Sequence, residues 1–401
     1  MKNIYKVAVI GGGTMGADLA ALIARQDMPV VIKEVNAELA ERLRGRLDQR
    51  IDGWLERGKI NASRAEQLKM LCTATASNDD LCDADLVIEA VPEDVNLKRK
   101  IFAELAVLLP DAILTSNTSS IPITSLSKGV ARPERLAGMH FFNPPTRMPL
   151  VELISAEATS PETLESLEVF AAETLAKKPI RVKDRPGFLV NVLLGAYLTP
   201  AIRALETTTV KPEAIDAEAK AFGWPMGPFV LLDMMGVDLV KEVMNILFSA
   251  YGDRFAPSCL VNALVSAGRL GQKTGAGFYD RVPGPAEARP GDHSESGSEP
   301  LDAILEKNFP ERTSGDAVQA FTDMMYSMVN ESAMALETAT ASANDIETGC
   351  LFGLGFPQAK GGPLHYGDQV GLGRLAEALG DSACPLLRGM AVRAETFFSS
   401  W

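Results

Sequence analysis

The chain has 401 residues, which is too long for one ordinary hydrophobic core, so we expect two or three domains. Hydrophobic residues make up 46% of it and charged residues 23%, as is usual for a globular enzyme. The net charge of -13 argues against nucleic acid as a partner, because phosphates in a nucleic acid need a basic surface. A few backbone amides and lysines can still bind a smaller phosphorylated ligand.

The sequence also favours a cytoplasmic protein. Its five cysteines lie far apart, and their odd number indicates reduced thiols. The lack of paired Cys or His ligands at short spacing argues against a zinc site. The first residues run directly into a predicted strand, which leaves no room for a signal peptide. The longest apolar stretch, residues 188–198, is too short to cross a bilayer. We therefore expect a cytoplasmic location, no membrane span and no bound metal.

The first part of the chain alternates apolar runs with helical patterns. Four apolar runs are typical of buried parallel strands, and they lie at residues 4–10, 29–32, 85–88 and 112–115. Residues 36–71 are rich in Leu, Arg, Glu and Lys and predict a helical insertion. Strands separated by helices indicate an α/β domain. We therefore predict a Rossmann-type, doubly wound nucleotide-binding domain over residues 1–184.

After this domain, helical spacing replaces the strand pattern. Residues 283–300 are rich in Pro, Gly, Ser and Glu and predict a linker. On both sides of it the pattern G-P-x4-D-x2-G occurs, from Gly227 and again from Gly362. Three further matches accompany it, namely Asn191 with Asn330, Glu206 with Glu337, and Asp216 with Asp345. We therefore predict a duplicated all-α C-terminal region, with a first helical domain at 185–282 and a second repeat at 301–401.

A glycine-rich turn follows the first predicted strand. Gly11, Gly13 and Gly16 form the pattern G-x-G-x-x-G, which opens a helix and lies 18 residues before Glu34, at the end of the second strand. These glycines permit a tight turn, approach of a pyrophosphate and close helix packing, and the phosphates bind at the helix N-terminus. Glu34 would bond the ribose hydroxyls and repel a 2′-phosphate. The sequence therefore predicts NAD as the cofactor, the alternative being a structural glycine turn.

His140 is the candidate general base among three histidines. It stands in an apolar run, residues 138–142, that ends at a proline turn. An imidazole suits removal of a hydroxyl proton during hydride transfer, because its pKa lies near neutral pH. A second apolar run, residues 150–154, contains Glu152. If the two runs fold back beside each other, Glu152 can orient the imidazole; otherwise His140 is a core histidine and Glu152 a surface residue.

Four motifs together resemble the 3-hydroxyacyl-CoA dehydrogenase family. They are SNTSSIPIT at 116–124, GMHFFNPPTRMPLVELI at 138–154, RPGFLVNVLL at 185–194 and FGWPMGP at 222–228. The similarity covers essentially the whole chain and extends to the dehydrogenase portion of the multifunctional fatty-acid oxidation proteins. It implies that the substrate is an acyl-CoA thioester. The implied reaction is oxidation of a (S)-3-hydroxyacyl-CoA to a 3-oxoacyl-CoA in β-oxidation, with NAD as the cofactor.

The resemblance also implies roles for individual residues. It makes His140 the base and Glu152 its partner, and it places Ser119 and Asn191 at the reacting oxygen, as catalytic and substrate-binding residues. The cofactor site would be lined by Gly11, Gly13, Met15, Gly16, Glu34, Glu93, Lys98, Asn117, Ser119 and Asn143. Without the resemblance, these polar side chains are explained by turn capping and by a solvated helix start.

Two other functions stay open at this point. One is a dehydrogenase of a small free hydroxy acid or sugar acid, and the other is a non-catalytic NAD-binding subunit. The multifunctional relatives carry an enoyl-CoA hydratase portion first, whereas this chain begins at the nucleotide-binding strand, so we expect no hydratase activity. A homodimer and an association with other β-oxidation enzymes are both compatible with the sequence, which does not indicate the acyl-chain length.

Overall fold

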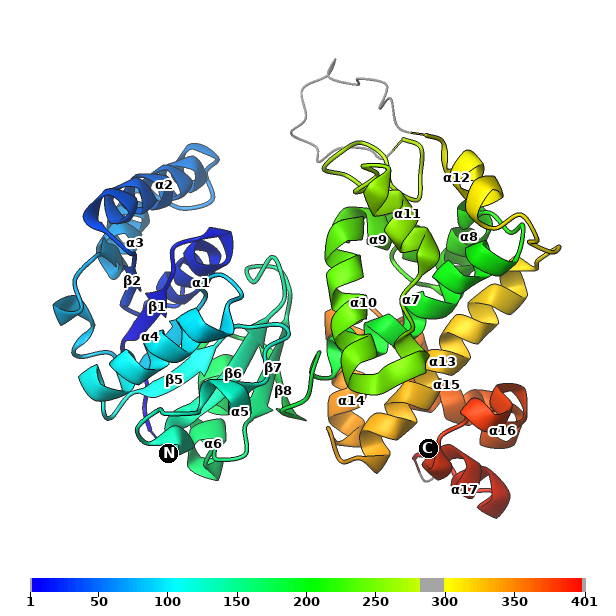
Figure 1. The fold of residues 1–401 in the computed structure, drawn as a ribbon. Coiled ribbons are helices and arrows are strands. Elements are labelled where there is room, and N and C mark those ends of the chain that lie inside the picture. The colour runs from blue at the N-terminus through cyan, green and yellow to red at the C-terminus, as the bar shows by residue number, and fades with distance from the viewer. Residues whose placement is uncertain (1, 282–298, 399–401) are drawn as a thin grey trace. The chain divides into compact units, whose positions relative to one another are not determined.

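The computed structural model describes residues 2–281 and 299–398. The chain divides into two compact units, Met1–Phe188 and Leu189–Trp401, which Figure 1 shows in the colours of the chain order. Most of the predicted linker at 283–300 lies outside the described residues. Each unit is described below by itself.

The first unit is built on one eight-stranded sheet with the order β3-β2-β1-β4-β5-β6-β7-β8. Strands β1 to β6 pair in parallel, β7 runs antiparallel to β6, and β8 runs parallel to β7. The strands are β1 Val7–Ile10, β2 Val30–Lys33, β3 Cys72–Thr75, β4 Leu86–Glu89, β5 Ile113–Ser116, β6 Leu136–Phe141, β7 Leu150–Ser155 and β8 Lys178–Lys183. With β1 between β2 and β4, this is the order of a doubly wound nucleotide-binding sheet, so the predicted Rossmann-type fold is confirmed.

Burial explains why some strands could be predicted and others not. All four residues of β1 and of β4 are buried, which produces the continuous apolar runs in the sequence. The edge strands β3 and β8 were not predicted. β3 is partly polar and has a single buried residue, and β8 alternates buried with exposed residues and contains two lysines. These strands show that burial on one face leaves a weaker pattern than burial on both.

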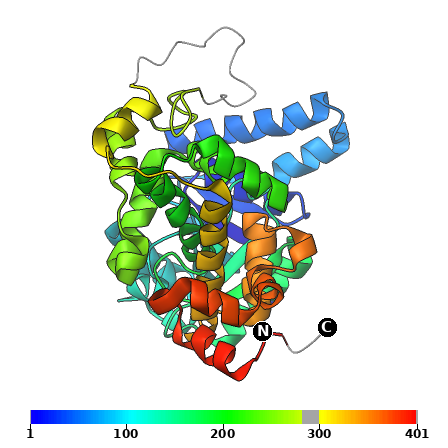
Figure 2. The same ribbon diagram turned by 90° about the vertical axis from the view of Figure 1, so that its right-hand side faces the viewer.

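Helices connect the strands of this unit. They are α1 Thr14–Ala24, α2 Ala37–Glu56, α3 Ala62–Leu71, α4 Val95–Leu108, α5 Ile123–Leu126 and α6 Pro161–Val169. The predicted helical insertion is the hairpin of α2 and α3, two neighbouring helices that Figure 2 shows side by side. Each begins at an asparagine whose side chain caps it, Asn36 for α2 and Asn61 for α3. The insertion therefore has well-defined local helix signals.

In its described residues the second unit has helices and no strand beyond two isolated bridges. Its helices are α7 Val190–Thr207, α8 Pro212–Phe222, α9 Pro228–Met235, α10 Val237–Tyr251, α11 Cys259–Ser266, α12 Leu301–Asn308, α13 Ala317–Glu337, α14 Ala343–Gly349, α15 Pro363–Val370, α16 Leu372–Leu379 and α17 Pro385–Arg393. The two longest, α7 and α13, pack against each other. Across the described ranges of both units, we find no helix with the length and apolarity needed to cross a membrane.

The two halves of the second unit repeat the same arrangement. In each half a long helix, α7 or α13, precedes a helix that opens at Gly-Pro, α9 or α15. Asp233 of α9 accepts hydrogen bonds from the backbone N–H groups of two aromatic residues at the end of the first half, at 2.7 and 3.0 Å. Asp368 of α15 accepts the equivalent pair at the end of the second half, at 2.8 and 3.1 Å. The predicted duplication is therefore visible as a repeated tertiary contact.

The predicted match of Asn191 with Asn330 is wrong. Asn191 is the second residue of α7, whereas Asn330 lies in the interior of α13. The side chain of Asn330 donates to the carbonyl oxygen of Ser382 and accepts from the N–H of Cys384, both at 2.8 Å. Asn330 therefore holds the start of α17 and does not repeat the position of Asn191.

The predicted match of Asp216 with Asp345 is also wrong. Asp216 accepts hydrogen bonds from the N–H groups of Phe229 and Val230, in the first turn of α9. In the second half it is Glu347 that accepts from the N–H of His365, in the first turn of α15, at 2.9 Å. The equivalent carboxylates thus differ in length, and Asp216 stands 11 residues before its Gly-Pro whereas Glu347 stands 15 residues before its own.

Burial raises the pKa of the Glu347 carboxyl from 4.5 to about 8, so this residue should make the stability of the protein depend on pH. Between these pH values the folded protein retains a proton that the unfolded chain has lost, so stability falls as the pH rises, by at most about 1.4 kcal/mol per pH unit. Glu347→Gln cannot titrate. We therefore expect the free energy of unfolding of this variant, relative to that of the wild type, to increase from pH 5 to pH 8. Chemical denaturation at each pH measures it.

The exposed Glu377 provides the matched control. The free energy of unfolding of Glu377→Gln should differ from that of the wild type by the same amount at each pH. An equally constant difference for Glu347→Gln would contradict the assignment.

Candidate active site

The glycine turn between β1 and α1 has the geometry of a dinucleotide-binding turn. Gly11 has a φ of +98°, which favours glycine, and its N–H donates to the carbonyl oxygen of Lys33 at 2.9 Å. A Cβ at Gly16 would lie 1.9 Å from the carbonyl oxygen of Gly11, so the helix can approach the turn only without a side chain there. A Cβ at Gly13 would meet no atom within 4 Å. Space beside Gly13 is therefore open to a pyrophosphate.

Charged residues of neighbouring elements surround this turn. Glu34 directly follows β2, and its carboxylate accepts a hydrogen bond from the N–H of Gly12 at 2.9 Å. Asp18 of α1, an unexpected negative charge so near a phosphate site, is 8% exposed and forms an ion pair with Arg50 of α2. Met15 packs against the hydrophobic core. The charge of Asp18 is thus compensated, and the carboxylate of Glu34 lies beside the glycine turn.

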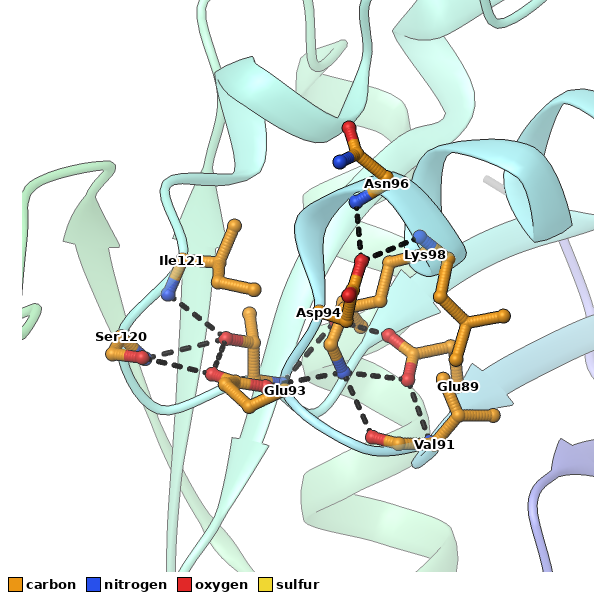
Figure 3. A network of polar contacts seen from close by, with 11 residues as sticks. Glu89, Val91, Glu93, Asp94, Asn96, Lys98, Ser120 and Ile121 are labelled. Atoms are coloured by element: carbon orange, nitrogen blue, oxygen red, sulfur yellow. Dashed lines mark hydrogen bonds and ion pairs between the residues drawn. The ribbon is translucent and has the colours of Figure 1, made fainter.

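A polar network joins the carboxyl ends of β4 and β5 (Figure 3). Glu89, the last residue of β4, is fully buried, and its Oε1 lies 2.7 Å from Nζ of Lys98. Ser116, the last residue of β5, donates its hydroxyl to Oε2 of Glu89 at 2.6 Å. The N–H of Val91 donates to Oε1 at 2.7 Å. Two buried charges are therefore paired and hydrogen-bonded, the condition under which burial of charge is tolerated.

Lys98 extends the network to the turn after β4. Its ammonium also donates to the carbonyl oxygen of Val91 at 3.1 Å and lies 3.2 Å from Oε2 of Glu93. Burial alone would raise the pKa of Glu93, but the charge of Lys98 and the hydroxyls of Thr118 and Ser120 lower it overall. Lys98 thus has three acceptors within the protein, and Glu93, which is 40% exposed, is the member of the pair that meets solvent.

Hydroxyl groups connect this turn to the loop after β5. Thr118 and Ser120 both donate to Oε1 of Glu93, Ser120 at 2.9 Å. Between them Ser119 is exposed. Asn117 accepts a hydrogen bond from the N–H of Phe141 at 2.9 Å, through its side-chain oxygen. The predicted residues of the β5 loop are therefore held between the β4 turn and the end of β6.

His140 and Glu152 form a buried pair. They lie opposite each other in the antiparallel ladder of β6 and β7, and Nδ1 of the imidazole is 2.7 Å from Oε2 of the carboxylate. His140 is 6% exposed and Glu152 is fully buried. The rings of Phe142 and Phe188 flank the imidazole, with centroids at 4.6 and 5.8 Å. Because Glu152 engages Nδ1, the nitrogen that can take a substrate proton is Nε2.

The remaining predicted residues lie in separate places. Asn143 is exposed in the loop between β6 and β7. Asn191 belongs to the second unit, where its side chain lines a small apolar pocket between α7 and α10. The first unit thus brings together the glycine turn, Glu34, the β4 and β5 ends and the His140–Glu152 pair on one sheet.

Sequence reasoning missed part of this site. Glu89, Ser116 and Thr118 are buried polar residues at or just after the carboxyl ends of strands. A charged residue that closes an otherwise apolar run, as Glu89 does after Leu-Val-Ile, is a usable signal, because such a position lies at the ligand edge of a parallel sheet. Lys177, a buried lysine before β8, has no comparable signal in the sequence.

Comparison with known families gives two adjoining matches. Residues 6–185 match the family described as "3-hydroxyacyl-CoA dehydrogenase, NAD binding domain". Residues 187–281 match the family described as "3-hydroxyacyl-CoA dehydrogenase, C-terminal domain". The chain is 34% identical to the fatty acid oxidation complex subunit alpha of Shewanella amazonensis, over 99% of this chain and 56% of that protein. It spans about half the length of the curated relatives that it matches, 51 to 56%.

Two solved structures are similar, one at comparable length and one over about two thirds of this chain. The 3-hydroxybutyryl-CoA dehydrogenase of Escherichia coli is 30% identical, with a TM-score of 0.84, and the match covers 98% of this chain and 99% of that one. The (S)-3-hydroxybutyryl-CoA dehydrogenase of Ralstonia eutropha is 33% identical, with a TM-score of 0.63, and the match covers 70% of this chain and all of that one.

Substitutions of two glycines in the turn should affect stability and cofactor binding differently. Gly16→Ala would force its Cβ against the turn, so we expect both a lower melting temperature and a loss of NADH binding. Gly13→Ala has room in the protein alone, so we expect a melting temperature within about 2 °C of the wild type. Its NADH affinity should still fall at least about tenfold, because the methyl group occupies the space for the pyrophosphate. Thermal unfolding and fluorescence titration check both, and unchanged NADH affinity in Gly13→Ala would place the pyrophosphate elsewhere.

Proposed function

The chain belongs to the 3-hydroxyacyl-CoA dehydrogenase family, and from that premise we propose that it oxidises a (S)-3-hydroxyacyl-CoA to the 3-oxoacyl-CoA with NAD, as a step of fatty-acid β-oxidation. The observation that carries the proposal is the buried His140–Glu152 pair, with 2.7 Å between the two side chains, in the same sheet as the glycine turn. A protein that only binds a dinucleotide has no need of this pair.

The protein's residues fit NAD. Gly11 and Gly16 shape the turn, the open space beside Gly13 admits the pyrophosphate, and Glu34 can accept hydrogen bonds from the ribose hydroxyls. The carboxylate of Glu34 would repel the 2′-phosphate of NADP. When bound, NAD supplies the acceptor for the hydride that leaves the substrate carbon. The polar residues at the ends of β4 and β5, with Met15, Glu93, Lys98, Asn117, Ser119 and Asn143, complete the proposed cofactor site.

His140 removes the hydroxyl proton in this mechanism. Glu152 holds Nδ1, which keeps Nε2 free of a proton before the reaction and stabilises the imidazolium formed when Nε2 takes the proton. The surrounding phenylalanines exclude water from the ring, so the interaction between imidazolium and carboxylate is strong. We assign Ser119 and Asn191 to the substrate oxygen, where a hydroxyl and an amide orient it by hydrogen bonds.

The biological setting belongs to the same proposal. Similar proteins are named as alpha subunits of fatty acid oxidation complexes, which supports an association with other β-oxidation enzymes, with a homodimer as the alternative. We propose a cytoplasmic location, because all five cysteines are free thiols.

Steady-state assays test the substrate class. We expect NADH formation from (S)-3-hydroxybutyryl-CoA and none from free 3-hydroxybutyrate, because the proposed substrate is a thioester. Activity with the free acid alone would support the small hydroxy-acid alternative. A series of acyl-CoA thioesters in the same assay then gives the chain-length preference.

The general base is tested by replacement of its side chain. We expect His140→Ala to lower kcat at least about a hundredfold while leaving NADH affinity within about threefold, because the imidazole acts on the substrate hydroxyl. Glu152→Gln keeps a hydrogen-bond acceptor but loses the charge, so its kcat should also fall. Near-normal turnover in His140→Ala would refute the assignment.

A further inference from the structure

The loop that joins β6 to β7, residues 142–149, carries part of the proposed site. It connects the strand of His140 to the strand of Glu152. Because β6 runs parallel to β1 through β5 and β7 returns antiparallel, the loop lies at the carboxyl edge of the parallel strands, where the glycine turn also lies. The loop carries Asn143, which is exposed.

Lys177 reaches this loop from the residue just before β8. Its ammonium donates hydrogen bonds to the carbonyl oxygens of Pro145, at 2.5 Å, and Met148, at 2.6 Å. Lys177 is only 8% exposed, and burial lowers the pKa of its ammonium. Within the described ranges, no carboxylate lies at ion-pair distance from it. The protein thus buries a cation whose partners are two backbone carbonyls.

A buried ammonium without a counter-ion is unfavourable, because the carbonyls replace only part of its hydration. An apolar side chain would fill the same space at lower cost if packing alone were needed. The loop itself offers few hydrogen bonds, since three of its residues are proline and lack an N–H. Its internal bonds run from the N–H groups of Arg147 and Met148 to the carbonyl oxygen of Pro144, at 3.0 Å each. The N–H of Lys178 donates to the carbonyl oxygen of Pro149, at 2.7 Å, at the far end of the loop. The two bonds from the Lys177 side chain therefore hold the residues before this point, Pro145 and Met148.

We propose that Lys177 is a positioning residue of the cofactor site, which holds the 142–149 loop through its backbone carbonyls and thereby keeps Asn143 in place. The inference rests on the proposed function in one respect, the assignment of Asn143 to the cofactor. The His140–Glu152 pair is held by the strand ladder and not by the loop. Loss of Lys177 should therefore weaken cofactor binding more than it slows proton transfer.

Lys177→Met tests this with Lys178→Met as the matched control, because Lys178 is the neighbouring residue and is exposed. We expect Lys177→Met to raise the Kd for NADH and the KM for NAD about tenfold. This factor corresponds to the loss of one hydrogen bond between Asn143 and the cofactor. Its kcat at saturating NAD should stay within about threefold, and the pH profile of kcat should not move. Lys178→Met should change each quantity less than about twofold. A purely structural lysine would lower the melting temperature and leave KM unchanged, and that result overturns the proposal.

A double-mutant cycle tests whether Lys177 acts through Asn143. Asn143→Ala should weaken NADH binding to a similar extent, and adding Lys177→Met should weaken it little further, because both changes remove the same contact. Fully additive losses would overturn the proposal. If Lys177→Met does not fold, Lys177→Arg replaces it. This variant keeps the charge and the donors but displaces the carbonyls, so it should raise the Kd for NADH by less than tenfold, and an unchanged Kd would count against the proposal.

Fluorescence titration with NADH separates this inference from the proposed reaction. If the wild type binds NADH but oxidises no 3-hydroxyacyl-CoA, the proposed function fails, and the Kd values of the Lys177 variants still decide the role of the lysine. If the wild type does not bind NADH, both proposals fail.

Discussion

The direction of the strands is the constraint on which the proposed site depends. Six strands of the sheet run parallel, so their carboxyl ends meet at one edge, and the residues that follow them are brought together although they are far apart in the chain. The glycine turn follows β1, Glu34 follows β2, Glu89 and Ser116 close β4 and β5, and the loop with Asn143 follows β6. The chain reversal between β6 and β7 then places a carboxylate opposite an imidazole in a ladder whose register fixes both. Packing of the core thus determines the geometry of the His140–Glu152 pair.

Charged groups are buried along this edge, and each is compensated in a different way. Glu89 and Lys98 neutralise each other, with Ser116 and a backbone N–H completing the hydrogen bonds. His140 and Glu152 form a pair that gains a full charge interaction only when the imidazole is protonated, which suits a base that is charged during the reaction. Among the residues that the structure describes, the partners of the Lys177 ammonium are two backbone carbonyls. Pairs of this kind are weak sources of stability, and their concentration at one edge of the sheet indicates that they order the loops there.

The sequence predicts those parts of the fold and site whose signals are local. The spacing of Gly11, Gly13, Gly16 and Glu34 lies within one strand–helix–strand unit, and His140 and Glu152 lie on adjacent strands joined by a short turn. Other contacts join residues that lie far apart in the sequence. Thr118 bonds to Glu93 across 25 residues, and Lys177 bonds to Pro145 across 32. Both follow from tertiary packing, which no short sequence pattern describes. The repeat was recognised from its glycines, prolines and aspartates, but its polar residues were misaligned. The reason is that a Val-Asn pair stands at the start of α7 but deep inside α13, and that the carboxylate bonded to the start of α9 or α15 is Asp in one half and Glu in the other.

The second repeat has kept the framework of the first and uses its polar residues for structure. Asp368 preserves the contact made by Asp233, and Asn330 and Glu347 bond to backbone N–H groups at helix starts. The Ralstonia eutropha enzyme matches 70% of this chain over its whole length, so a chain of this family can lack a stretch of this size. In the present chain α13 covers a side of α7, the helix whose second residue is Asn191. We therefore regard the second repeat as a support for the helix that carries a proposed substrate contact, since its own buried polar side chains are engaged in helix capping and in contacts between helices.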